Sequence, residues 1–139
     1  MTRALGIDLG DARVGVAIAD ELGILAHPLE TITVKDTEPV ARIAEIAVRD
    51  KIGTIVLGLP RNMDGTYGPA AEKSRAFAEK LRASTGCVVK LWDERLTSVA
   101  AQRSLHEAGR NAKQSRSVID QVAAQLILQG WLDSQAMLG

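Results

Sequence analysis

The sequence has a single cysteine, Cys87, very few aromatic residues and no net charge. One cysteine excludes an internal disulfide and a metal site built from several thiolates. Aromatic residues make up 3% of the chain, which disfavours a site where single-stranded bases stack on aromatic side chains. Basic and acidic residues number 17 each, so the overall charge does not indicate a nucleic-acid partner.

The sequence also lacks a long apolar run and a basic segment followed by an apolar stretch. These features are typical of membrane spans and of leaders, so we expect a cytoplasmic chain with no membrane partner. The chain has 139 residues, of which 46% are hydrophobic. This is enough for one core, and we expect a single domain over residues 1–139.

Positive charge is concentrated between residues 95 and 117. Five cations and one acid, Glu107, give this segment a charge of five minus one, or +4. The residues from 110 to 117 are polar and lack a period, which predicts a loop. Its cations Arg110, Lys113 and Arg116 are expected to contact a nucleic-acid backbone, although a merely solvated loop remains an alternative.

Alternating apolar and small residues predict two strands at the start of the chain, joined by a tight turn at Asp11 and Ala12. A third strand over 25–34 is expected at an edge of the sheet, because Pro28 cannot donate a hydrogen bond to a neighbour. Two further strands and four helices follow, with strands near 54–58 and 88–92 and helices over 38–51, after Pro69, up to Gly109 and over 117–132.

These elements predict an α/β fold with a five-stranded mixed sheet flanked by helices. Right-handed crossovers place the strands in the order 3-2-1-4-5, with strand 2 antiparallel. Ligands of such sheets bind beyond the carboxyl ends of the parallel strands. We therefore expect functional residues at that edge.

Three acids lie in apolar surroundings, where an unpaired charge is costly. Asp8 is in the first strand, Glu94 follows the last strand, and Asp120 shares a helix face with Ala123 and Ala124, whose small side chains are expected to leave room for an ion. Oxygen-only ligands favour Mg²⁺ or Mn²⁺. The alternatives are a turn-forming role for Asp8, a surface ion pair for Glu94 and a salt bridge between Asp120 and an arginine.

A loop follows Gly58 and contains several turn-forming residues. Its Arg61 and Asn62, together with Arg13, are candidates for holding phosphates through side-chain and backbone donors. A simple connecting loop is the alternative.

Five blocks of sequence carry a resemblance over residues 4 to 133. They are Gly-Ile-Asp-Leu-Gly-x-x-Arg-Val-Gly-Val-Ala from Gly6, Gly-Leu-Pro-x-x-Met-Asp-Gly-Thr-x-Gly from Gly58, Phe77-Ala78-x-x-Leu81, Asp-Glu-Arg-Leu-Thr-Ser from Asp93 and Asp-x-x-Ala-Ala-x-x-Ile-Leu-Gln from Asp120. Together they resemble the YqgF family, bacterial relatives of the Holliday-junction resolvase RuvC with a ribonuclease H-like fold. The chain departs from the family before Asp120, where uncharged residues such as Asn111 and Gln114 dilute a run that is usually densely basic.

The resemblance implies a hydrolase, a metal-dependent phosphodiesterase of endo- or exonuclease type, with Asp8, Glu94 and Asp120 as catalytic residues. We expect these acids to hold two Mg²⁺ or Mn²⁺ ions. The implied function is processing of the 5′ end of pre-16S rRNA in ribosome biogenesis. One alternative is resolution of Holliday junctions in branched DNA, and another is a non-catalytic RNA-binding protein of the same fold.

Overall fold

A computed structural model describes residues 2–60, 64–94 and 112–138, with the side chains of 112–118 excepted. The elements are β1 (Arg3–Leu9), β2 (Arg13–Ala19), β3 (Ala26–Thr33), α1 (Pro39–Arg49), β4 (Ile52–Leu59), α2 (Pro69–Thr85), β5 (Val88–Asp93) and α4 (Ala112–Leu138). The strands form one sheet in the order β3-β2-β1-β4-β5. β2 is antiparallel to both of its neighbours, whereas β1, β4 and β5 are parallel. The predicted sheet order is confirmed.

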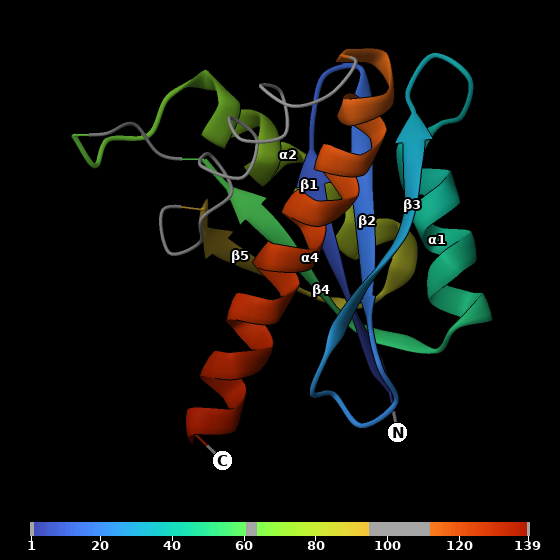
Figure 1. The fold of residues 1–139 in the computed structure, drawn as a ribbon, viewed down its shortest axis with the longest axis vertical. Coiled ribbons are helices and arrows are strands. Elements are labelled where there is room, and N and C mark those ends of the chain that lie inside the picture. Colours follow the sequence, from blue (N-terminus) through green and yellow to red (C-terminus); the bar gives the residue numbers. More distant parts are fainter. Residues whose placement is uncertain (1, 61–63, 95–111, 139) are drawn as a thin grey trace.

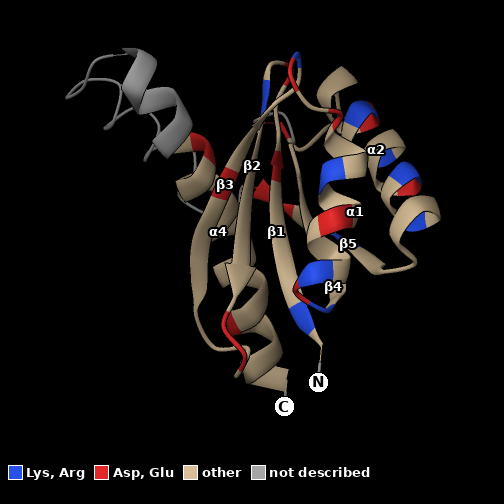
Figure 2. Ribbon diagram, turned by 90° about the vertical axis from the view of Figure 1, so that its right-hand side faces the viewer, with Lys and Arg blue, Asp and Glu red and all other residues tan. Residues whose placement is uncertain are grey.

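The sheet separates two layers of helices. α4 crosses one face, and α1 and α2 cover the other (Figures 1 and 2). Alternation along β1 sends Leu5 and Ile7 into the core beneath α1 and α2, whereas Ala4 belongs to the core beneath α4. Asp8 is in step with Ala4 and Gly6, so its side chain faces α4.

Small residues bring α4 close to the sheet. Ala123 and Ala124 are buried, and a Cβ at Gly6 would lie 2.7 Å from the carbonyl oxygen of Ala124. The two alanines therefore allow close helix–sheet packing, which differs from the expectation that they leave room for an ion.

Three glutamines of α4 hold it along the edge strand. Gln121 donates to Oγ1 of Thr31, and Gln125 donates to the carbonyl of Ala26. Gln129 accepts from the amide of Ala26 and donates to the carbonyl of Ile24. The bonds of Gln125 and Gln129 satisfy backbone groups at the edge of the sheet, and all three glutamines fix the position of α4 relative to β3.

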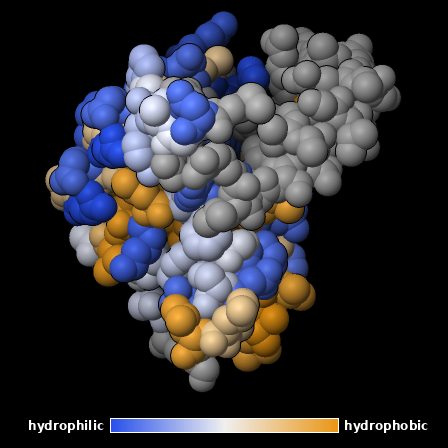
Figure 3. Space-filling view, turned by 90° about the vertical axis from the view of Figure 1, so that its left-hand side faces the viewer, coloured by the Kyte–Doolittle hydropathy of each residue, from blue (hydrophilic) through white to orange (hydrophobic). Residues whose placement is uncertain are grey.

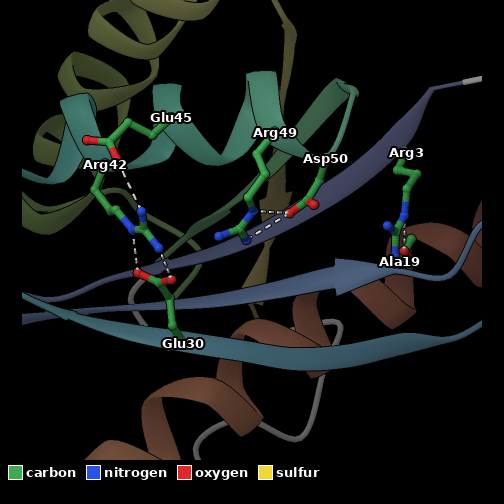
Figure 4. Close-up of polar contacts among 7 residues, drawn as sticks. All are labelled: Arg3, Ala19, Glu30, Arg42, Glu45, Arg49 and Asp50. Atoms are coloured by element: carbon green, nitrogen blue, oxygen red, sulfur yellow. Dashed lines mark hydrogen bonds and ion pairs between the residues drawn. The ribbon is translucent and has the colours of Figure 1, made fainter.

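The opposite face is tied to β3 by an ion pair. Arg42 of α1 donates to both carboxylate oxygens of Glu30, at 2.9 and 2.7 Å, and a third bond joins Arg42 to Glu45 (Figure 4). α1 begins at Pro39, and the side chain of Glu38 accepts from the amide of Ala41 at 2.6 Å. The bond to Glu45 and the capped start of α1 therefore hold the Arg42 side of this contact in place.

The predicted loop over 110–117 is wrong from residue 112 onward, because α4 begins at Ala112. The stretch lacks glycine and proline, and alanine, lysine, glutamine and arginine favour helix even where no apolar period marks it. The expected helix ending at Gly109 lies outside the described residues.

Apolar side chains are exposed at the end of the molecule where α4 finishes. Figure 3 shows apolar groups gathered at the lower end of the face that it draws, and Met137 and Leu138 are 89% and 83% exposed. None of the described helices combines the length and apolar character needed to span a membrane.

Candidate active site

Asp8 lies near the carboxyl end of β1, at the centre of the sheet, and is 3% exposed. It is opposite Gly15 of β2. On its other side Ile7 is in register with Leu57 of β4, so the next residue of β4, Gly58, flanks Asp8. A buried carboxylate thus lies between two glycines on neighbouring strands.

The other two acids lie over these glycines. A Cβ added at Gly58 would come within 2.7 Å of Oε1 of Glu94, and one added at Gly15 would lie 2.0 Å from the carbonyl oxygen of Asp120 and 3.1 Å from its Cβ. The absence of side chains at Gly15 and Gly58 therefore lets Glu94 and Asp120 approach the sheet on either side of Asp8. All three acids converge on the carboxyl edge, where the sequence predicts them.

Asp120 forms an ion pair with an arginine. Nε of Arg13 donates to Oδ2 of Asp120 at 2.8 Å, and the side chains are 32% and 13% exposed, respectively. The salt bridge that the sequence left open for Asp120 is thus present. Among the described residues, no three histidine, cysteine, aspartate or glutamate side chains are arranged to hold a metal ion.

The donor set nevertheless fits a hard divalent cation. Asp8, Glu94 and Asp120 supply only carboxylate oxygens, the ligands that Mg²⁺ and Mn²⁺ prefer. The two glycines let Glu94 and Asp120 lie against the sheet on either side of Asp8, since a Cβ at either position would meet their atoms. Cys87, a softer ligand, lies at the opposite edge of the sheet, where its thiol contacts the carbonyl of Ile52 at the start of β4.

The expected nucleic-acid contacts are only partly described. Arg61, Asn62 and Arg110 lie outside the described residues, and Lys113 and Arg116 fall in the part of α4 whose side chains are not described. Arg13 is half-buried on Asp120.

Sequence reasoning missed two contacts made by residues of α2. Lys73 of α2 pairs with Asp11 in the turn between β1 and β2. The guanidinium of Arg75 lies 4.5 Å from the centre of the Tyr67 ring, a cation–π contact. The Lys73–Asp11 pair joins positions 62 residues apart, so no local spacing could have signalled it.

The sequence matches the family model described as "RuvX: Holliday junction resolvase" over residues 2–134. The chain belongs to the RuvX family. A RuvX relative from Myxococcus xanthus is 50% identical over 133 residues, which cover 95% of this chain and 88% of the relative. A second, from Symbiobacterium thermophilum, is 48% identical over 132 residues, covering 94% and 92%. Both are named, provisionally, as pre-16S rRNA nucleases.

The RuvX chain also shares its fold with a solved resolvase. The structure of T. thermophilus RuvC in complex with a Holliday junction substrate has a TM-score of 0.60 at 15% identity, covering 99% of this chain and 97% of that one. At this identity the likeness shows the fold alone, and it confirms the RuvC-like architecture expected from the sequence.

Proposed function

We propose that the protein is a metal-dependent nuclease that processes the 5′ end of pre-16S rRNA in ribosome biogenesis. The observation that carries this proposal is the placement of Glu94 and Asp120 over the two glycines that flank buried Asp8. Membership of a family whose relatives are named for this activity supports it.

Asp8, Glu94 and Asp120 are the residues that would hold two Mg²⁺ or Mn²⁺ ions. When bound, such ions supply an activated water and stabilise the charge that develops on the cleaved phosphate. The chain supplies position: Asp8 is fixed within the central strand, and the glycines of β2 and β4 fix how closely the other two acids approach. Hydrolysis by this route needs no serine or cysteine nucleophile.

Substrate binding is proposed to rest on phosphate contacts. Arg13 lies at the same edge of the sheet as the three acids. The remaining proposed contacts, assigned from the sequence, are Arg61, Asn62, Arg110, Lys113 and Arg116. Phosphate contacts position a nucleic acid without reading its bases, which suits a substrate selected by its structure.

Holliday-junction resolution is the second candidate function. It is favoured by the description of the family and by the fold shared with RuvC. Cleavage of a structured pre-16S rRNA 5′ leader should therefore be compared with cleavage of a four-way DNA junction at equal Mg²⁺ concentration. Selective cleavage of the RNA is expected, and selective cleavage of the junction would establish the alternative. Cleavage at the RNA end or within the strand distinguishes exonuclease from endonuclease action.

Asp8→Asn should abolish Mg²⁺-dependent cleavage, lowering the single-turnover rate by more than about a hundredfold. The metal-free protein should be equally or more stable, because repulsion among the three carboxylates is relieved. Asp133→Asn, at an exposed position of α4, is the matched control and should cleave normally. An Asp8→Asn protein that is folded and cleaves at the wild-type rate would show that cleavage does not depend on Asp8. A wild-type protein that binds RNA but cleaves neither substrate would instead leave a non-catalytic RNA-binding role.

A further inference from the structure

Arg13 and Asp120 form an ion pair inside the site assigned to a cation. The pair joins the first residue of β2 to α4, and its two side chains are 32% and 13% exposed. Asp120 packs over Gly15, the residue opposite Asp8. The guanidinium is therefore a positive charge bound to one of the three carboxylates that the proposed mechanism needs.

We infer that Arg13 is the resident counter-ion of Asp120, and that a divalent cation binds this carboxylate by exchanging with the guanidinium. The inference rests on the proposed function, which assigns Asp120 to the cation site. It makes Arg13 a residue that controls metal affinity in addition to its predicted contact with phosphate.

The geometry of the pair supports exchange, because Nε of Arg13 donates to Oδ2 of Asp120 at 2.8 Å and so occupies a carboxylate oxygen that a cation would need. An acidic cluster near the core needs a cation for stability, and attraction between partly buried charges is screened less than at the surface. Replacement of the guanidinium by a divalent cation keeps the negative charge of Asp120 balanced in both the metal-free and the metal-bound protein.

The position of Arg13 allows this exchange. It follows the exposed turn residues Asp11 and Ala12, and its own side chain is one-third exposed, so the guanidinium can move toward solvent without unpacking the core. Once displaced, it lies at the carboxyl edge of the sheet without its carboxylate. A phosphate of the substrate is the partner that this charge would then take.

The test is calorimetric titration of Mn²⁺ into the full chain and its Arg13→Gln variant, without nucleic acid. If the Arg13 guanidinium occupies Asp120 most of the time, the apparent affinity for Mn²⁺ is reduced in proportion to the fraction of molecules in which Asp120 is open. Removing the guanidinium should tighten Mn²⁺ binding by about tenfold. Lys73→Gln is the matched control, because it removes a cation of α2 that pairs with Asp11 instead of Asp120. Its Mn²⁺ affinity should change by less than about twofold.

Melting temperatures separate exchange from a purely structural role. Metal-free Arg13→Gln should melt below the wild type, and Mn²⁺ should raise its melting temperature more than it raises that of the wild type. If Arg13 has a purely structural role, the substitution should lower the melting temperature by the same amount with and without Mn²⁺. Equal or weaker Mn²⁺ binding by Arg13→Gln would overturn the exchange.

Asp8→Asn distinguishes failure of this inference from failure of the proposed function. Weak Mn²⁺ binding by Asp8→Asn with unchanged binding by Arg13→Gln would retain the cation site and reject the exchange. Wild-type affinity in Asp8→Asn would instead reject the assigned site. If neither the wild type nor Arg13→Gln binds Mn²⁺, both proposals are rejected.

Discussion

At the scale of single residues, pairing with Arg42 determines the ionisation of Glu30. Hydrogen bonds from the guanidinium, followed by its charge, lower the pKa of Glu30 from its ordinary value of 4.5. Both side chains are 27% exposed, so the contact is shielded more than the pairs along the outer surface of α2. Because it joins α1 to the edge strand β3, its ionisation affects how the two layers hold together.

Glu30→Gln should lower the free energy of unfolding by about 1 kcal/mol at pH 7. Since the pKa of Glu30 is lower in the folded state, the stabilisation is present above pH 4.5, the ordinary pKa, and is lost as pH falls through the folded pKa. Denaturant unfolding of both proteins from pH 7 to pH 3 should therefore show their stabilities converging.

Glu79→Gln provides the control for this prediction. Glu79 pairs with Arg82 on α2, but the glutamate side chain is 74% exposed. We expect a change within about 0.5 kcal/mol. A stability difference for Glu30→Gln that stays constant down to pH 3 would show that packing, and not charge, holds the contact.

At the scale of elements, the site depends on how closely segments approach the sheet at two glycines. A Cβ at Gly58 would meet the ends of two flexible side chains, Cδ1 of Ile127 at 2.6 Å and Oε1 of Glu94 at 2.7 Å. A Cβ at Gly15 would meet the backbone of Asp120 at 2.0 Å, which can move only with α4. The same substitution should therefore have different consequences at the two positions.

Gly58→Ala should reduce cleavage by more than about tenfold, because it displaces the Glu94 carboxylate, while costing only about 1–2 kcal/mol in stability. Gly15→Ala should cost about 3 kcal/mol as well as activity, because α4 must move. Single-turnover rates and urea unfolding measure both effects.

Gly23→Ala is the control for these substitutions. A Cβ at Gly23 meets nothing within 4 Å, but the φ of +70° at this position should make alanine cost about 1 kcal/mol in stability, with activity retained. Equal losses of activity in Gly58→Ala and Gly23→Ala would contradict the role of Gly58 in positioning Glu94.

The limits of sequence reasoning also appear at this scale. The order of the elements and the handedness of crossovers were sufficient for the strand order. The edge position of β3 followed from Pro28, which cannot donate a hydrogen bond to a neighbouring strand. Small residues one turn after Asp120 are compatible with either an ion or close packing, so their spacing could not show that they pack. The partner of Asp120 was left open because Arg13 is 107 residues away, and no local pattern records such a contact.

At the scale of the whole molecule, charge is unevenly divided despite a net charge of zero. Acidic and basic residues are mixed on the outer surfaces of α1 and α2 (Figure 2). The segment with a charge of five minus one, over residues 95–117, precedes Asp120 directly. Mixed charges give little net attraction for a phosphate chain, so backbone binding is expected on the side of the basic segment.

Replacing Arg110, Lys113 and Arg116 together by alanine should weaken nucleic-acid binding uniformly across sequences. The slope of log K against log salt should fall in magnitude by about two to three. Cleavage at saturating substrate should stay within about tenfold of wild type, because these residues are expected to bind phosphates and not the reacting group. Fluorescence anisotropy over a range of salt concentrations tests this. An unchanged slope would indicate that the nucleic acid binds around Arg13 and Arg61 instead.

The distance in sequence between Asp8 and Asp120 links activity to the completion of folding. Contacts between residues so far apart carry a large entropic cost of closure and form slowly. β1 can pair with β2 through a local turn, but Asp120 reaches this pair only when α4 docks along β3. A chain that has formed its first hairpin but has not yet docked α4 therefore has Asp8 in place without a complete site. The proposed cleavage of RNA begins only in molecules that have finished folding.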